Sequence, residues 1–216
     1  RILGLNGHAV VQGYGGRLPE WQSLMRDVRA TPGVTDATAI IEQPSIMSFR
    51  NRAEGVLLRG MFWPDIARDK MLVDNVKDGN IKALEVPDDN VIAIGAALAT
   101  QIGVRVSDHV SLISPEGQVT PFGTTPRIVP YRVAAIFEVG IFDYDKALVI
   151  MPMDRAQTFL RLGDDVGMIT LVTKDADAVD KILAPLLPKV SSRGVIVNWR
   201  DLNGVLFEAL AVERTV

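Results

Sequence analysis

One local pattern occurs near both ends of the chain, and it constrains the fold more than any other feature of the sequence. A predicted helix is followed by Gly33-Val34 and a strand, and the same order returns at Gly194-Val195. The pattern indicates two related βαβ-like units that come together around an inserted central part. A glycine that caps a helix would give the same letters, so both interpretations stay open.

Apolar periodicity and turn residues place the elements along the chain. Helices are expected where Leu18, Trp21, Leu24, Met25 and Val28 recur, and over residues 96–102, 154–162, 176–187 and 201–216. Strands are expected over residues 34–49 with an interruption at Pro44, and over residues 55–62, 91–94, 104–106, 109–113, 131–137, 147–151, 168–173 and 194–199. This order predicts an α+β protein in two parts.

Composition and charge exclude several classes of protein. The net charge is −3 over 216 residues and the basic residues are scattered, so the chain lacks the electrostatic footprint of a nucleic-acid-binding protein. Because there is no cysteine, disulfides, cysteine nucleophiles and thiolate metal sites are excluded. The longest strongly apolar run, residues 91–99, is under half of the ~20 residues that a membrane-spanning helix needs. No signal peptide is visible in residues 1–7, and we expect the chain as given to be soluble.

The sequence contains no recognisable catalytic motif. A hydrolytic triad needs a nucleophile beside a base, but there is no Gly-x-Ser-x-Gly elbow, and the two histidines, His8 and His109, are far apart in the sequence. We expect His109 to be a surface residue of a strand. Gly13, Gly15 and Gly16 resemble a phosphate-binding loop, but Leu18 stands where the dinucleotide fingerprint needs its third glycine. A flexible linker is the favoured interpretation.

A cluster of acidic residues, Glu138, Asp143 and Asp145, surrounds Tyr144. Paired carboxylates perform acid–base chemistry or bind calcium, but this cluster lacks the regular spacing of a calcium loop. A solvated turn is favoured. We therefore expect no enzymatic activity, no metal and no cofactor.

The connection at residues 114–130 is hard to explain as an ordinary loop. We expect its four prolines (Pro115, Pro121, Pro126 and Pro130) to prevent regular sheet pairing, because proline lacks a backbone donor. The segment also carries Phe122, Ile128 and Val129, which a mere solvent loop would not favour. A stiff hairpin with apolar groups loses little entropy when it docks on a partner, and its backbone can extend a partner's sheet. Folding back over its own core would explain the same residues, and that alternative stays open.

Short motifs rich in glycine, proline and apolar residues lie along nearly the whole chain. They are Gly4-Leu5-Asn6-Gly7-His8, Val91-Ile92-Ala93-Ile94-Gly95, Leu98-Ala99, Ile102-Gly103-Val104, Val106, Asp108, Val110, Leu112-Ile113-Ser114-Pro115-Glu116-Gly117, Thr120-Pro121-Phe122-Gly123, Pro126-Arg127, Val133, Ile136-Phe137, Gly140, Tyr144-Asp145, Trp199, Leu206-Phe207, Ala209-Leu210 and Glu213-Arg214. Together these residues resemble the periplasmic domain of the LolC/LolE family of lipoprotein-releasing ABC transporter permeases. The first and last of them resemble the family's junctions after its first and before its second transmembrane helix. One departure is Ser107, where the family usually has glycine, and it leaves the local turn geometry in doubt.

The resemblance implies a MacB-like periplasmic core of the α+β class. Residues 1–62 and 165–216 would form a βαβ-repeat (porter-like) subdomain from both chain ends. Residues 63–164 would form an inserted β-rich (sabre-like) subdomain with a protruding hairpin at about 119–130. The apolar stripe Leu202, Leu206 and Leu210 is consistent with a helix that leads toward a membrane segment, although a core-packing helix would look the same.

The resemblance also implies a function on the periplasmic side of the bacterial inner membrane. The family releases lipoproteins from that membrane and hands them to the periplasmic carrier LolA, using a second permease subunit, a cytoplasmic ATPase and flanking transmembrane helices that this chain lacks. The hairpin resembles the hook that captures the carrier in LolC-type proteins, so the chain is LolC-like or a hybrid subunit. The implied carrier contacts are Thr120, Pro121, Phe122, Gly123, Pro126, Arg127 and Ile128.

The sequence leaves two other functions open. The first is a mechanotransmission domain of a MacB-like efflux permease, whose partner is an adaptor protein. The second is a periplasmic hydrolase or binding enzyme whose site escapes recognition in the sequence. An apolar segment of ~20 residues on each side of this chain would favour the permease over the enzyme.

Overall fold

The chain folds into two compact units. The structure is a computed structural model that describes residues 7–121 and 123–201, with residues 115, 116 and 118–120 described by their backbone alone. Unit 1 combines Arg1–Ala39 with Asp165–Val216, and unit 2 is Ile40–Asp164. Residues 40–62, which the sequence analysis placed in the part built from both ends, therefore cluster with the insert. The helix expected over residues 201–216 lies almost wholly outside the described residues.

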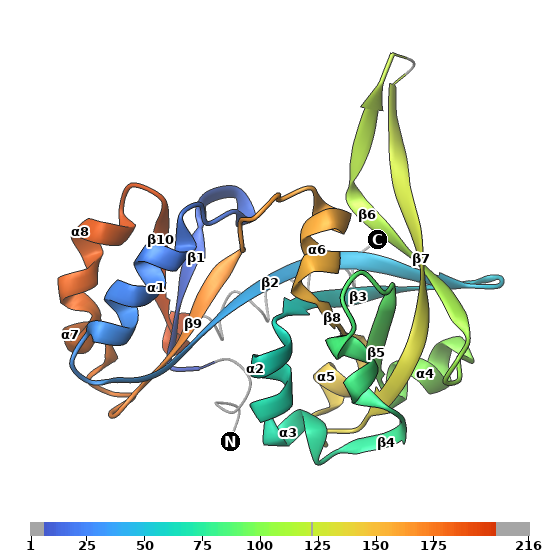
Figure 1. Ribbon diagram of the computed structural model, residues 1–216, viewed down its shortest axis with the longest axis horizontal. Coiled ribbons are helices and arrows are strands. Elements are labelled where there is room, and N and C mark those ends of the chain that lie inside the picture. The colour runs from blue at the N-terminus through green and yellow to red at the C-terminus, as the bar shows by residue number, and fades with distance from the viewer. Residues whose placement is uncertain (1–6, 122, 202–216) are drawn as a thin grey trace. The chain divides into compact units, whose positions relative to one another are not determined.

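Unit 1 is a split βαβ arrangement that the two ends of the chain build together. Its sheet has the strand order β10-β1-β9-β2, and α1, α7 and α8 lie on one side of that sheet (Figure 1). Two βαβ segments interleaved in this order give the ferredoxin-like motif. The prediction of a βαβ-repeat part built from both ends is confirmed. Its elements are β1 (Ala9–Gly13), η2 (Tyr14–Gly16), α1 (Trp21–Ala30), the first part of β2 (Val34–Phe49), β9 (Met168–Thr173), α7 (Val179–Leu183), η4 (Ala184–Leu186), α8 (Leu187–Val190) and β10 (Gly194–Asn198).

The two Gly-Val pairs meet different physical needs. Gly33 has φ +95°, and the side chain of Ile182 lies 3.1 Å from where a Cβ atom would stand. Gly194 has no positive φ; instead, a Cβ atom there would collide with the backbone carbonyl of Gln12 on the neighbouring strand β1. A left-handed conformation requires the first glycine and a close strand contact requires the second. The two Gly-Val pairs thus occupy equivalent places in the fold, each between a helix and the following strand, but their glycines have different backbone conformations.

The single helix expected over residues 176–187 is wrong. The segment is divided into α7, η4 and α8, and Pro185 and Pro188 stand in the first turns of η4 and α8. Proline is tolerated in a first turn but cannot continue a helix, because it has no N–H to donate. The sequence pattern missed the breaks because Val179, Leu183, Leu186 and Val190 are all buried and keep an apolar stripe.

Unit 2 is a small closed sheet with short helices around it. The strands pair in the order β2-β3-β8-β5-β7, and β6 pairs with both β7 and β2, which closes the ring. Closure leaves these six strands without a free edge in the ring. The elements are the second part of β2, β3 (Arg52–Met61), α2 (Trp63–Arg68), α3 (Lys70–Val73), β4 (Val76–Gly79), η3 (Ile81–Glu85), β5 (Val91–Gly95), α4 (Ala96–Ile102), β6 (His109–Thr120), β7 (Gly123–Phe137), α5 (Phe142–Ala147), β8 (Leu148–Pro152) and α6 (Met153–Leu160).

One buried ion pair lies in the ring. Arg59 on β3 stands opposite Glu42 on β2, and its Nε and Nη2 atoms donate to Glu42 Oε2 at 2.8 and 2.5 Å. The Arg59 guanidinium also lies 5.9 Å from the centre of the Tyr144 ring. Burial by itself would lower the pKa of Arg59, but the charge of Glu42 and the contacts with Tyr144 raise it. Arg59 is therefore charged at every accessible pH.

Two expected features of the strands are wrong. Strand β2 continues through Pro44, which pairs with Leu57. The segment Val104–Val106 is not a strand, because residues 104 and 105 are irregular and lead into a turn at residues 106 and 107. That turn contains Ser107 at φ +76°, with its backbone N–H donated to Val133 O at 2.8 Å. A side chain is strained in the left-handed region. This explains why glycine suits position 107, where the sequence departs from the family it resembles.

The strain at Ser107 leads to a prediction. Ser107→Gly is expected to raise the free energy of unfolding by about 0.5–1 kcal/mol, because relief of the left-handed strain outweighs the added freedom of the unfolded chain. Urea unfolding of both proteins measures the change. Ser48→Gly is the control, because Ser48 lies within the extended strand β2, where glycine costs stability. An equal loss of stability in both variants would contradict the strain at Ser107.

Candidate partner-binding hairpin

Strands β6 and β7 form a long antiparallel hairpin that leads from the ring of unit 2 to the turn at Thr120 and Gly123. Pairing extends from His109↔Arg132 to Thr120↔Gly123, so the expectation that the prolines prevent regular pairing is wrong. The register shifts between Ser114 and Gln118. Prolines 115 and 126 lie at that shift, where the ladder is interrupted and no donor is required. Pro121 occupies the turn, and Pro130 is the one proline held in the regular ladder, opposite Ser111.

Gly117 allows the two strands to approach at the register shift. A Cβ atom at this position would collide with the Thr124 side chain and would lie 2.8 Å from the carbonyl oxygen of Thr125. Only glycine leaves room for that approach. The sequence Pro115-Glu116-Gly117 is therefore explained by the geometry of a bulged hairpin.

The base of the hairpin is anchored in the core of unit 2. Tyr131 is 2 % exposed, and its ring packs edge-on against Phe159 of α6, with ring centres 6.1 Å apart. On the opposing strand, Val110 and Leu112 are fully buried. The Ser45 hydroxyl donates to the carbonyl of Ile113 at 2.7 Å and ties β6 to β2. Aromatic packing of this kind fixes the direction in which the hairpin leaves the ring.

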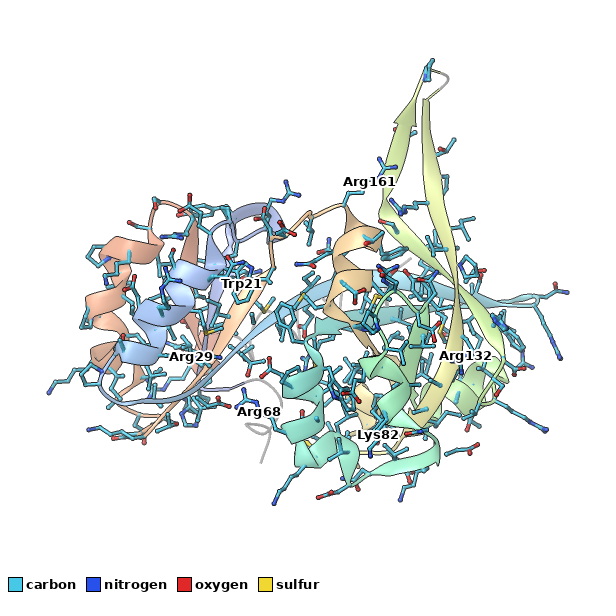
Figure 2. All side chains as sticks on the ribbon, viewed as in Figure 1. Trp21, Arg29, Arg68, Lys82, Arg132 and Arg161 are labelled. Carbon is cyan, nitrogen blue, oxygen red and sulfur yellow. The ribbon has the colours of Figure 1, made fainter. Side chains whose placement is uncertain are left out.

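Above that base the hairpin stands away from the rest of unit 2 (Figure 1). The described side chains from Gly123 to Pro130 are all exposed or half-buried, and they point into open space on both sides of the strands (Figure 2). Ile128 is 58 % exposed. The hairpin thus does not fold back over the core of its own unit in the part that the structure describes. This removes the alternative that the sequence left open.

The expected contact residues are distributed over the tip and two faces of the hairpin. Thr120 and Gly123 pair beside the turn, and Pro121 is exposed within it. Phe122 lies outside the described residues. Successive side chains of a strand point to opposite faces, so Pro126 and Ile128 share one face of β7. Arg127 is on the other face, together with the buried Tyr131.

Arg127 places a positive charge on one face of the hairpin. Its guanidinium makes no hydrogen bond or ion pair with any residue whose side chain the structure describes, and the Arg127 side chain is half-buried. It lies close enough to Tyr131 to act on its ionisation. Burial raises the pKa of Tyr131 to about 12, although Arg127 and Arg155 oppose the shift. A carboxylate of a partner could pair with Arg127 in a charge-assisted hydrogen bond.

A row of three isoleucines crosses three neighbouring strands at the base of the hairpin. Ile46 on β2 pairs with Ile113 on β6, which pairs with Ile128 on β7. Directly opposed residues of antiparallel strands place their side chains on the same face. Ile46 is 46 % exposed and Ile128 is 58 % exposed, so the row forms an apolar surface. Sequence reasoning missed Ile46 and Ile113, and only the alternation of Pro44, Ile46 and Ser48 along β2 could have indicated an outward face.

The acidic cluster does not form a catalytic site. Asp145 is 6 % exposed, and its carboxylate accepts the backbone N–H groups of Val139 at 2.8 Å and Gly140 at 3.0 Å. The prediction of a solvated turn is therefore wrong for Asp145, whose role is to hold the turn together. Asp143 is exposed, and Glu138 lies 3.7 Å from Lys77. Among the described residues, no group of three or more His, Asp or Glu side chains could hold a metal ion.

Each histidine has a structural explanation. His109 is exposed at the start of β6, as expected of a surface strand residue. His8 Nδ1 accepts the backbone N–H of Thr173 at 3.1 Å. Within the described part of the chain, no serine or threonine hydroxyl is hydrogen-bonded to His109. The one hydroxyl within hydrogen-bond distance of His8 is that of Thr173, and it donates its hydrogen to the carbonyl of Asp175 rather than to the imidazole. The geometry of a nucleophile–base pair is therefore not met.

The fold is that of the extracytoplasmic domains of MacB-type ABC transporters. It matches the periplasmic region of MacB from Actinobacillus actinomycetemcomitans with a TM-score of 0.53 at 12% identity, covering 95% of each chain. It matches the extracellular domain of the noncanonical ABC-type transporter YknZ from Gram-positive bacteria with a TM-score of 0.52 at 14% identity, covering 85% of this chain and 90% of that one. The predicted fold is confirmed. No described helix is both long enough and apolar enough to cross a membrane.

In sequence, the chain is similar over its whole length to proteins named lipoprotein-releasing system transmembrane protein LolC. It is 28% identical to that of Xylella fastidiosa strain Temecula1 over 216 residues, which are all of this chain and 52% of the relative. It is 25% identical to that of Neisseria meningitidis serogroup B over 215 residues, or 99% of this chain and 52% of the relative. The chain thus spans about half the length of these relatives. No protein-family model matches it. The resemblance to LolC-type permeases with a MacB-type domain is confirmed.

Proposed function

We propose that this chain is the periplasmic domain of a lipoprotein-releasing permease, and that the β6–β7 hairpin docks the periplasmic carrier LolA. One observation supports this most directly. The hairpin is anchored by buried residues at its base, yet none of its described side chains from Gly123 to Pro130 is buried. The similarity to proteins named LolC along the whole chain supports a partner that takes part in lipoprotein release.

The hairpin is suited to capture a folded partner. Its ladder, the register shift and its prolines hold the backbone in one conformation, so little conformational entropy is lost on docking. Ile128 and Pro126 offer apolar contacts on one face, while Arg127 offers a charge on the other. A partner that wraps around the hairpin would contact both faces, and the isoleucine row would extend the apolar contact onto β2.

The rest of the transporter belongs to the same proposal. Lipoproteins would be released from the outer leaflet of the bacterial inner membrane, with ATP hydrolysed on a separate cytoplasmic subunit. A second permease subunit and transmembrane helices on either side of this domain would complete the complex. In that arrangement this domain has no catalytic residue of its own, and its contribution is to receive the carrier.

Binding to purified LolA tests the proposal. The unsubstituted domain is expected to bind with a Kd in the micromolar range, because a single hairpin buries a modest interface. Arg127→Glu and Phe122→Ala are each expected to weaken binding at least tenfold, measured by isothermal titration calorimetry. Arg105→Glu is the matched control, because Arg105 is an exposed arginine of unit 2 outside the hairpin. Undiminished binding in both hairpin variants would remove the hairpin from the interface.

A second candidate function is a mechanotransmission domain whose partner is an adaptor protein. The likeness to the periplasmic region of MacB favours it. An adaptor that bound this domain, with LolA showing no binding at millimolar concentration, would replace the first proposal by this one.

A further inference from the structure

His8 and Trp199, which lie close to the two limits of the described part of unit 1, are joined to each other. The backbone N–H of Trp199 donates to the carbonyl of His8 at 2.9 Å, next to the pairing of β1 with β10. On its other side, His8 donates its N–H to Leu171 O at 2.6 Å. Strand β9 therefore also holds the first described residues. Gly7 is confined as well, since a Cβ atom there would lie 2.5 Å from the Leu171 carbonyl oxygen.

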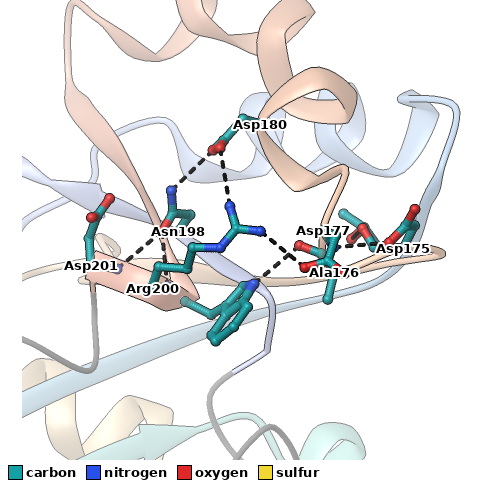
Figure 3. Close-up of polar contacts among 9 residues, drawn as sticks. Asp175, Ala176, Asp177, Asp180, Asn198, Arg200 and Asp201 are labelled. Atoms are coloured by element: carbon teal, nitrogen blue, oxygen red, sulfur yellow. Dashed lines mark hydrogen bonds and ion pairs between the residues drawn. The ribbon is translucent and has the colours of Figure 1, made fainter.

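Two side chains fix the last described residues to the segment before α7 and to the first turn of α7 itself. The indole Nε1 of Trp199 donates to the carbonyl of Ala176 at 3.1 Å. The guanidinium of Arg200 lies 5.2 Å from the centre of the Trp199 ring. Its Nη2 atom is 3.0 Å from Asp177 Oδ1, and its Nη1 atom is 4.0 Å from Asp180 Oδ2 (Figure 3). The planar fork of an arginine presents N–H donors in several fixed directions, so one guanidinium can contact two carboxylates in this way.

Asn198 starts a new helical turn at the same place. Its Oδ1 atom accepts the backbone N–H groups of Arg200 at 2.9 Å and Asp201 at 3.1 Å, which is the hydrogen bonding of a helix N-cap. Its Nδ2 atom donates to Asp180 Oδ1 at 3.2 Å (Figure 3). Residues 199–201 are helical. The cap and the Arg200 contacts thus converge on Asp180 and set the direction in which the chain leaves β10.

We infer that Trp199, Arg200, Asp177, Asp180 and the cap residue Asn198 form a clamp that fixes the helical turn at residues 199–201 to the rest of unit 1, beside His8. Because His8 and Trp199 are held together, unit 1 would follow a movement of the chain at either residue as a rigid body. Arg200 is the positioning residue of this clamp. The role of the clamp in transport rests on the proposed function. In a permease, movement of the flanking segments would pass through the clamp into the periplasmic domain.

The residues of the clamp can be substituted without unfolding the domain. The side chains of Arg200 and Asp177 are 46 and 84 % exposed, and exposed ion pairs contribute little to global stability. Their removal should therefore loosen the exit point and leave the core of unit 1 intact. A local loss of this kind is what hydrogen exchange resolves residue by residue.

Hydrogen exchange of the 216-residue chain tests the clamp itself. Arg200→Glu places a negative charge beside Asp177 and Asp180, and the amides of Trp199, Arg200 and Asp201 are expected to exchange at least tenfold faster. Amides in the middle of β1 and β9 should keep their rates. Combining Arg200→Glu with Asp177→Arg restores an ion pair and should return the three rates to within about threefold of the original. Lys181→Glu makes the same change of charge on an exposed residue of α7 and should change none of them.

Unchanged exchange at residues 199–201 in Arg200→Glu would overturn the clamp, and so would a uniform rise across unit 1. The consequence for transport is tested in the full-length permease, reconstituted with its ATPase. Arg200→Glu is expected to retain ATP hydrolysis and to reduce lipoprotein release at least fivefold, with recovery in the Arg200→Glu, Asp177→Arg variant.

The two experiments separate the clamp from the proposed function. Normal release by Arg200→Glu, despite fast exchange at residues 199–201, would overturn the coupling role and leave the proposed function standing. If the unsubstituted complex released no lipoprotein, the proposed function would fail. The exchange rates would still decide whether the clamp exists.

Discussion

Arg59→Ala is expected to lower the free energy of unfolding by about 3–5 kcal/mol, because it leaves the carboxylate of Glu42 without its partner in a buried position. Arg59 is 3 % exposed, and the Glu42 side chain is 18 % exposed. Two hydrogen bonds from the Arg59 guanidinium and its contact with the Tyr144 ring are lost together. The loss is read as a shift of the urea unfolding midpoint at constant slope.

A double variant separates the missing partner from the missing volume. Arg59→Met combined with Glu42→Leu removes both charges and keeps most of the packing, and it is expected to be at least about 2 kcal/mol more stable than Arg59→Ala. Tyr144→Phe is the control for the aromatic contact and should have a smaller effect than either. Equal losses in the single and double variants would show that packing, rather than the unpaired carboxylate, accounts for the cost.

Most of the elements follow from local pattern, and the departures have identifiable causes. Helix α4 and strand β9 have the bounds that periodicity predicts, since Gly103 ends the first and alternating burial marks the second. The split of residues 176–187 follows from Pro185 and Pro188, but the apolar stripe across both breaks concealed it. The continuity of β2 through Pro44 depends instead on which backbone donors the neighbouring strands use, and that choice is not written in the local sequence. The closure of unit 2 by β6 likewise depends on pairings between residues far apart in the chain.

The candidate site was only partly predictable for the same reason. The concentration of prolines and apolar residues in 114–130 identified the hairpin, because few other structures tolerate that composition. It did not reveal which face of the hairpin Arg127 and Ile128 occupy. Side chains alternate between the two faces of β7, but only the burial of Tyr131 at the base shows which of these faces continues into the core. The contribution of Ile46 comes from a strand more than sixty residues away in sequence, and pairing alone brings it beside Ile113.

Tyr131→Ala is expected to cost about 3–4 kcal/mol of stability, because it opens a cavity against Phe159 where the hairpin joins the ring. The same change should weaken LolA binding, since the direction of the hairpin is no longer fixed by a packed ring. Urea unfolding and calorimetric titration measure the two effects. Tyr131→Phe keeps the ring and should preserve both properties at neutral pH.

The pH dependence of stability gives an independent check on that anchor. Burial raises the pKa of Tyr131 to about 12 in the folded protein, whereas in the unfolded chain it is about 10. Below about pH 10 the phenol is neutral in both states, so the folded protein keeps its full stability. Between about pH 10 and 12 the unfolded state loses its proton first, and the free energy of unfolding should fall by roughly 2–3 kcal/mol. Tyr131→Phe has no phenol to ionise, so it should lack this part of the alkaline loss. Identical alkaline profiles for the two proteins would contradict a buried, neutral Tyr131 at the base of the hairpin.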